Sequence, residues 1–121
     1  MRVPKTKALR DWEKLISKYM VSVGVPLRWD ERSKRFQGVK GFSFTRIAPA
    51  SDGGWSRIPQ FLRRYESELS NGSPHPVVMF VTNTRYGPDI EDSLVVTRVE
   101  TFTEMLRICV ENDPNRYLGE Q

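Results

Sequence analysis

Cysteine and histidine are scarce in this chain, which holds one of each among its 121 residues. A single cysteine excludes an intramolecular disulfide, and one Cys with one His cannot build a zinc site or a Cys–His nucleophile pair with a ligand to spare. The P-loop pattern G-x-x-x-x-G-K-[ST] is also missing, which disfavours a nucleoside triphosphate site. Any catalysis would therefore depend on carboxylates.

Long apolar runs are missing as well. No segment approaches the roughly 20 apolar residues of a membrane span, and the N-terminal sequence MRVPKTKALRDW lacks the apolar stretch of a signal peptide. We therefore expect a soluble, cytoplasmic protein that has no membrane partner. The length favours a single domain over 1–121, with 112–121 as a short C-terminal tail.

What is present is an alternation of helical and strand patterns. Apolar residues at steps of three and four predict helices over 6–23, over 58–69, and from 101 to a point before Pro114. The last is expected to open with a capping box formed by Thr101 and Glu104. Aromatic and β-branched runs predict strands at 25–29, 35–36, 41–47, 77–81 and 94–96, of which 77–81 is expected to be buried on both faces. The order α-β-β-β-α-β-β-α predicts an α/β fold, a mixed twisted sheet flanked by helices.

These patterns also predict the core. Apolar positions of the expected elements place five residues in one cluster: Ile16, Leu62, Val78, Phe80 and Leu106. Cys109 lies on the apolar side of the third helix and is expected to join the core.

Positive charge is concentrated in one stretch. The chain has 19 Lys and Arg against 15 Asp and Glu, a net charge of +4. Segment 27–46 contains six of the basic residues and two acids, interleaved with Trp29, Phe36 and Phe42, a composition that can meet phosphates and stack on bases. The candidate nucleic-acid-binding residues are Arg28, Arg32, Lys34, Arg35, Lys40, Arg46 and, at the second helix, Arg57. The alternative is a solvated strand face over a core that contains the aromatic rings.

Acidic residues offer a second interpretation. Asp11, Glu13, Asp30 and Glu31 surround the first helix and first strand, and carboxylates that converge there could bind Mg²⁺ for phosphodiester hydrolysis. The alternative is that each lies on a solvated face, as most acids do. His75, between two prolines, is expected in a surface loop.

The segment from Gly38 to Arg107 resembles the phage-type Holliday-junction-resolvase-like proteins of the PD-(D/E)XK nuclease superfamily. Gly38-Val39-Lys40-Gly41-Phe42 is similar to the turn before the family's catalytic strand, and 76–80 is similar to its buried strand. Segment 94–99, followed by Phe102, Glu104, Leu106 and Arg107, is similar to its last strand and closing helix, and Trp55 stands near the start of the preceding helix. The resemblance implies a restriction-endonuclease-like core.

The family's catalytic motif is degenerate in this sequence. The resemblance sets Arg35 at the position of the metal-binding Asp, Thr45 at that of the Glu and Ile47 at that of the Lys, and no acid occurs between Arg32 and Ser51. Arg repels a divalent cation, while Thr and Ile supply neither a carboxylate nor a charge. The resemblance therefore implies a pseudoenzyme with no catalytic residues, metal or cofactor, although residual activity is left open.

Three hypotheses follow. The first is an inactive nuclease-fold protein that binds duplex or branched DNA through a basic surface. The second is a protein-interaction module, a phage-like accessory or inhibitor protein, and a homodimer is left open. The third is a metal-dependent nuclease or resolvase rearranged around Glu13, Asp30 and Glu31. Cations that share a face would favour DNA, and cations that scatter would favour a protein partner.

Overall fold

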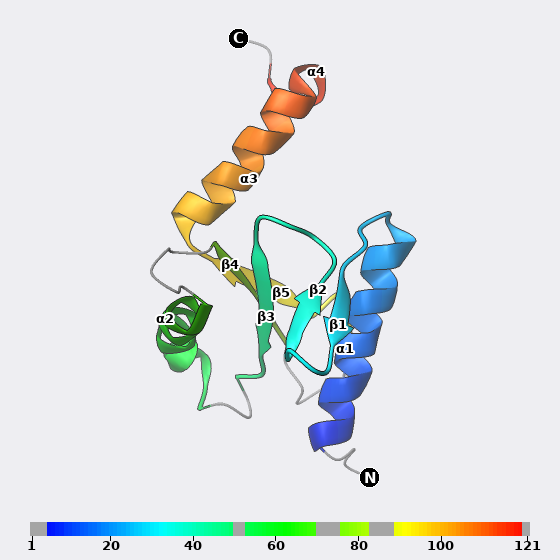
Figure 1. The fold of residues 1–121 in the computed structure, drawn as a ribbon, viewed down its shortest axis with the longest axis vertical. Coiled ribbons are helices and arrows are strands. Elements are labelled where there is room, and N and C mark those ends of the chain that lie inside the picture. Colours follow the sequence, from blue (N-terminus) through cyan, green and yellow to red (C-terminus); the bar gives the residue numbers. More distant parts are fainter. Residues whose placement is uncertain (1–4, 50–52, 70–75, 83–88, 120–121) are drawn as a thin grey trace.

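The computed structural model describes residues 5–49, 53–69, 76–82 and 89–119. The elements follow the expected order (Figure 1), with two additions: a 3₁₀ turn before the second helix and a short helix in the C-terminal tail. They are α1 (Lys5–Ser22), β1 (Arg28–Asp30), β2 (Arg35–Gln37), β3 (Ser43–Ile47), η1 (Trp55–Arg57), α2 (Ile58–Leu69), β4 (Val77–Val81), β5 (Leu94–Thr97), α3 (Val99–Asn112) and α4 (Pro114–Tyr117).

The five strands form one mixed sheet in the order β1-β2-β3-β4-β5. The pairs β1–β2, β2–β3 and β4–β5 are antiparallel, whereas β3 and β4 are parallel because α2 carries the chain across between them. The predicted α/β class is confirmed. The central strand β4 is buried along its whole length, as its unbroken apolar run predicts.

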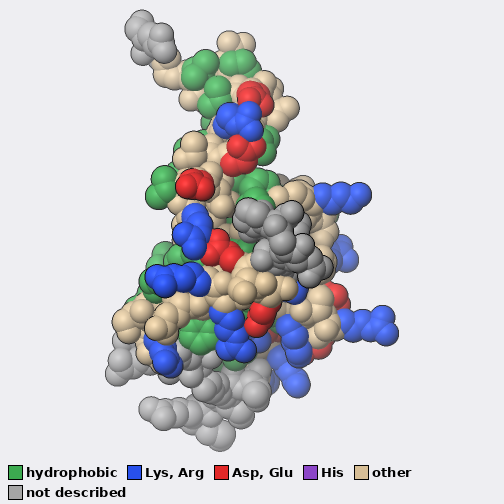
Figure 2. All heavy atoms as spheres, turned by 60° about the vertical axis from the view of Figure 1, so that its left-hand side comes forward, with side chains coloured by type: hydrophobic (Ala, Val, Ile, Leu, Met, Phe, Trp, Pro, Cys, Tyr) green, Lys and Arg blue, Asp and Glu red, His purple; other side chains and the backbone are tan. Residues whose placement is uncertain are grey.

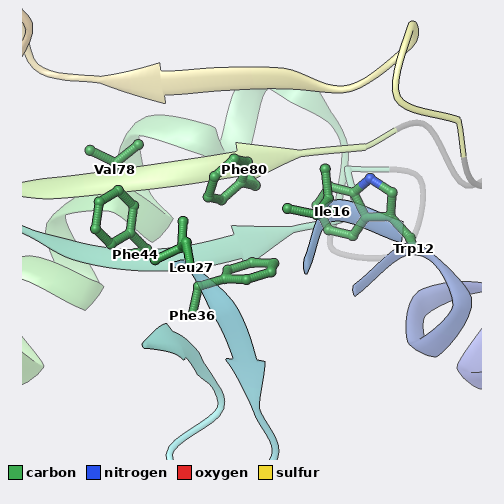
Figure 3. Packing of buried hydrophobic residues seen from close by; sticks show 7 residues of the cluster. All are labelled: Trp12, Ile16, Leu27, Phe36, Phe44, Val78 and Phe80. Atoms are coloured by element: carbon green, nitrogen blue, oxygen red, sulfur yellow. The ribbon is translucent and has the colours of Figure 1, made fainter. Parts of the chain in front are cut away.

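Helices α1 and α2 cover opposite faces of the sheet. Alternate residues of β4 point to opposite sides, so that Val78 and Phe80 pack with Trp12 and Ile16 of α1 (Figure 3), together with Leu27, Phe36 and Phe44. On the other face, Val77, Met79 and Val81 pack with Ile47 and with Ile58 and Leu62 of α2. The prediction of one cluster was therefore wrong for Leu62, which lies in the second cluster.

Helix α3 departs further from expectation, because it extends away from the sheet (Figure 1). Leu106, predicted in the core, is exposed on it, and Cys109 is only half-buried. The helix begins at Val99 with Arg98 as its N-cap and no side-chain cap. The predicted capping box is therefore wrong, and Thr101 lies inside the helix and is buried.

The C-terminal tail holds a further helix that the sequence pattern did not predict. The side chain of Asp113 accepts a hydrogen bond from the backbone N–H of Arg116 and caps α4, with Pro114 in its first turn.

None of the described helices is both long and apolar enough to cross a membrane. His75 lies outside the described residues.

Candidate nucleic-acid interface

The outer face of α1 carries a row of cations. Trp12, Glu13 and Ile16 are buried against the sheet, and the residues at steps of three and four on the other side of the helix are exposed: Lys7, Arg10, Lys14 and Lys18. Residues at this spacing lie above one another on a helix. At 1.5 Å per residue the row extends roughly 16 Å. We call these four residues the α1 row.

A groove runs between α1 and β1 beside this row. It has a volume of about 510 Å³ and is lined by Arg10, Glu13, Lys14, Ser17, Arg28, Trp29 and Glu31. Arg10 and Lys14 belong to the α1 row, and Arg28 lines the groove from the edge strand β1. Three cations therefore border one groove with an indole ring among them.

Trp29 is fixed in position by its surroundings. Its backbone N–H donates to Ser17 Oγ (2.9 Å), and the Ser17 hydroxyl donates to the carbonyl of Glu13 (2.7 Å). The indole N–H donates to Glu31 Oε2 (2.8 Å), and the ring meets Phe36 edge-on at 5.1 Å between centroids. The Trp29–Ser17 bond ties β1 to α1, and the other contacts hold the indole ring, which forms one wall of the groove.

Arg46 contacts the Trp29 ring and already has an ion-pair partner. Its Nε donates to Glu13 Oε1 at 2.6 Å, and its guanidinium lies 4.9 Å from the centroid of the Trp29 ring. Burial raises the pKa of the Glu13 carboxyl, against the smaller opposing effect of the Arg46 charge. Arg46 therefore serves this internal ion pair and the Trp29 ring.

The structure separates the other predicted DNA-binding residues. Lys34 pairs with Glu31 in the β1–β2 turn, where Arg32 is exposed beside it. Arg35 alternates with the buried Phe36 and so points to the sheet face opposite α1. Lys40 is exposed in the loop before β3, and Arg57 is exposed at the end of η1, just before α2. Of the candidates, the structure brings only Arg28 into the groove beside the α1 row.

Two of the three positions that the resemblance aligns with the family's catalytic residues are buried. Thr45 and Ile47 are buried on the α2 face of β3, and the Thr45 hydroxyl has no hydrogen-bond partner. No group of three or more His, Cys, Asp or Glu side chains that could hold a metal ion occurs in the described ranges.

The proposed alternative acids are each held by different neighbours. Glu13 pairs with Arg46, and Asp30 Oδ2 accepts from the Ser33 hydroxyl (2.9 Å). Glu31 accepts from Trp29 and Lys34, and these hydrogen bonds lower the pKa of its carboxyl. The Ser33 hydrogen bond likewise lowers the pKa of Asp30.

The exposed surface of α1, β1 and the β1–β2 turn has a local excess of positive charge. It includes three exposed or half-exposed acids, Asp11, Asp30 and Glu31, against seven exposed cations: Lys7, Arg10, Lys14, Lys18, Arg28, Arg32 and Lys34. On this surface the cations therefore outnumber the acids by four. The groove is therefore one edge of the region where positive charge gathers.

Sequence reasoning missed the α1 row because it weighed the density of charge along the chain. The signal was present in the spacing of 7, 10, 14 and 18, which complements the apolar spacing of 9, 12 and 16.

Comparison with protein-family models, curated proteins and solved structures found no match to this chain. The resemblance to resolvase-like nucleases stays a prediction.

Proposed function

We propose that this protein binds duplex or branched DNA through the α1 row and Arg28, and that it contacts phosphates without reading base sequence. The observation that carries the proposal is the row of four exposed cations on one face of α1, beside a groove that Arg28 borders. Positively charged helices of this kind neutralise phosphates and release condensed counterions.

The geometry favours contact with the nucleic-acid backbone. A row of roughly 16 Å covers about five base-pair steps at 3.4 Å each. Lys and Arg on an exposed helix face supply phosphate contacts, which position a duplex and carry no sequence information. The hydrogen bond from the Trp29 backbone N–H to Ser17 holds β1 against α1, so that Arg28 borders the same groove as Arg10 and Lys14.

The test measures affinity against salt. Fluorescence anisotropy with a labelled duplex and a four-way junction would be recorded at several salt concentrations for wild type, Lys14→Ala and Arg10→Ala. Each lost phosphate contact lowers the slope of log affinity against log salt by about 0.9 on duplex DNA. We expect this reduction in both variants, for unrelated duplex sequences alike.

Arg63→Ala is the matched control, because Arg63 is an exposed cation on α2, on the other side of the sheet. It should keep the wild-type slope. A wild-type protein that binds no DNA at low salt, or equal losses in all three variants, would contradict the proposal. The same mixtures, incubated with Mg²⁺ or Mn²⁺ and run on denaturing gels, should contain intact DNA.

A protein partner is the second candidate function. It is favoured by the separation of the predicted cations over two faces of the sheet, with Lys34 and Arg46 already paired. An acidic protein surface would bind the same α1 row. Failure of DNA binding in the salt series, with an intact fold, would favour this candidate.

A further inference from the structure

The end of the chain exposes an unusual amount of apolar surface. Seven large apolar side chains between β5 and the residue after α4 are each 46% to 80% exposed: Leu94, Val95, Val99, Phe102, Leu106, Tyr117 and Leu118. We call α3 with α4 the arm. Figure 2 shows hydrophobic side chains along it, beside a stripe of acidic and basic side chains.

This surface has three parts. The base is the edge strand β5, where Leu94 and Val95 are exposed on opposite faces of the sheet. The seam is the face of α3 that carries Val99, Phe102 and Leu106 at helical spacing, with the half-buried Val110 one turn further. The tip is Tyr117 and Leu118, at and after the end of α4.

The base does not have the features of a solvent-exposed edge. Among the described strands, β5 pairs with β4 alone. Natural edge strands are protected by Lys, Pro, bulges or inward charges, but the sequence of β5 is Leu-Val-Val-Thr. An apolar edge of this kind calls for a cover in the assembled protein.

We propose that a second copy of this chain covers the surface, in a two-fold dimer whose α3 helices pack antiparallel about Leu106. An antiparallel pair centred there sets Leu106 against its own counterpart and Phe102 opposite Val110 of the other copy. The same symmetry brings the tip of each arm to the base of the other, so that Tyr117 and Leu118 meet the region of Leu94 and Val95. One operation therefore buries base, seam and tip together.

The charges of the arm are compatible with self-association. Segment 94–118 contains three basic and four acidic residues, so it carries −1, whereas the rest of the chain carries +5. Within α3, Arg107 pairs with Glu104 and Glu111, and both glutamates lie on the side of the helix away from Leu106.

The area also fits. Seven side chains, each about half exposed, present on the order of 600 Å² of apolar surface per copy, at the upper end of the largest patches seen on monomers. A stable interface buries about 800 Å² per partner, so base, seam and tip together provide most of that area and the polar side chains around them would add the rest. Nucleic acid is a poor occupant, because the arm is slightly acidic.

Light scattering coupled to size exclusion, over a range of protein concentrations, tests the proposal. We expect a wild-type dimer and a Leu106→Lys monomer, because that substitution sets two ammonium groups against each other at the two-fold axis. Ile108→Lys is the matched control: Ile108 is 38% exposed on the side of α3 away from the seam, and its new charge lies near Glu104 and Glu111. It should remain a dimer, and circular dichroism should show equal helix content in all three.

A cross-link tests the geometry independently. In a Cys109→Ser background, which removes the only cysteine, Leu106→Cys should form a disulfide-linked dimer under mild oxidation, and Ile108→Cys should not. A wild type that is monomeric at every concentration would overturn the proposal. A dimer that survives Leu106→Lys, or equal cross-linking at both positions, would overturn it as well.

Discussion

Glu13 and Glu31 border the same groove, but their surroundings act on them in opposite directions. Glu13 is buried against the sheet, and that burial raises its pKa although Arg46 lies at 2.6 Å. Glu31 is exposed, and hydrogen bonds from Lys34 and Trp29 lower its pKa. A carboxylate held by donors at the surface gains stability from its charge, whereas a carboxylate buried with one partner loses it.

This difference predicts opposite effects of pH on stability. A Glu with a raised pKa binds more protons in the folded state, so the stability that it contributes is present below its ordinary value of 4.5 and is lost as pH rises through the raised value. The difference in unfolding free energy between wild type and Glu13→Gln should therefore fall as pH rises above about 4.5. Urea titrations across this range measure it.

Glu31→Gln supplies the control with the opposite sign. The lowered pKa of Glu31 means that its contribution is present above 4.5 and is lost as pH falls through the lowered value. The wild type should therefore gain stability relative to Glu31→Gln as pH rises toward 4.5. If the difference in unfolding free energy from wild type changed with pH in the same direction and by the same amount for both variants, burial would not determine the pKa of Glu13.

At the scale of elements, the β1–β2 hairpin depends on a close backbone approach at its open end. Gly38 follows β2 with φ +122, and a Cβ at this position would lie 1.8 Å from the carbonyl oxygen of Pro26. Backbone, rather than a flexible side chain, meets the added atom. The segment before β1 and the end of β2 can therefore lie side by side only with glycine at 38.

Gly38→Ala should for this reason be far more costly than Gly24→Ala. Gly24, after α1, also has a positive φ of +87, but a Cβ there meets nothing within 4 Å. Both alanines suffer the strain of left-handed backbone, about 1–2 kcal/mol. Gly38→Ala adds a steric clash of the kind that costs roughly 1–3 kcal/mol more. Chemical denaturation of both variants compares them, and equal midpoints would exclude the close approach.

Element patterns explain why much of the fold could be predicted from the sequence. The 3–4 spacing of α1 and the apolar run of β4 report burial directly, and both were confirmed. The same reasoning failed for α3. An apolar helix face indicates a packing surface, but the sequence pattern does not tell whether that surface packs against the same chain or against another molecule. Leu106 was placed in the core for that reason, and the structure leaves it exposed.

The site was less predictable than the fold, again for a physical reason. Arg46 belongs to the basic stretch, but its charge is satisfied by Glu13, which lies 33 residues earlier in the chain. Alternation along the strands puts Arg28 and Arg35 on the same sheet face, opposite Trp29 and Phe36, and only the structure shows that Arg28, on the edge strand, also lines the groove. Charge density along the chain cannot report either fact, whereas helical spacing could have revealed the α1 row.

At the scale of the whole molecule, charge and apolar surface are segregated. The α1 and β1–β2 surface carries the positive excess, and the arm at the other end of the chain is almost neutral and apolar. Such a separation lets one region associate with its copy while the other stays available to an anionic partner. If both proposals hold, the dimer presents two α1 rows on one particle.

The last prediction joins these two surfaces. A dimer that engages a long duplex with both rows releases counterions at both, so its salt slope should exceed that of the Leu106→Lys monomer and approach twice its value. Its affinity should also rise, because the second row binds at the effective concentration set by the first. On a duplex of about six base pairs, which accommodates a single row of roughly 16 Å, the two proteins should have the same slope. Ile108→Lys should follow wild type on both duplexes. Equal slopes for dimer and monomer on long DNA would mean that one row alone contacts the duplex, even if dimerisation and DNA binding are each confirmed separately.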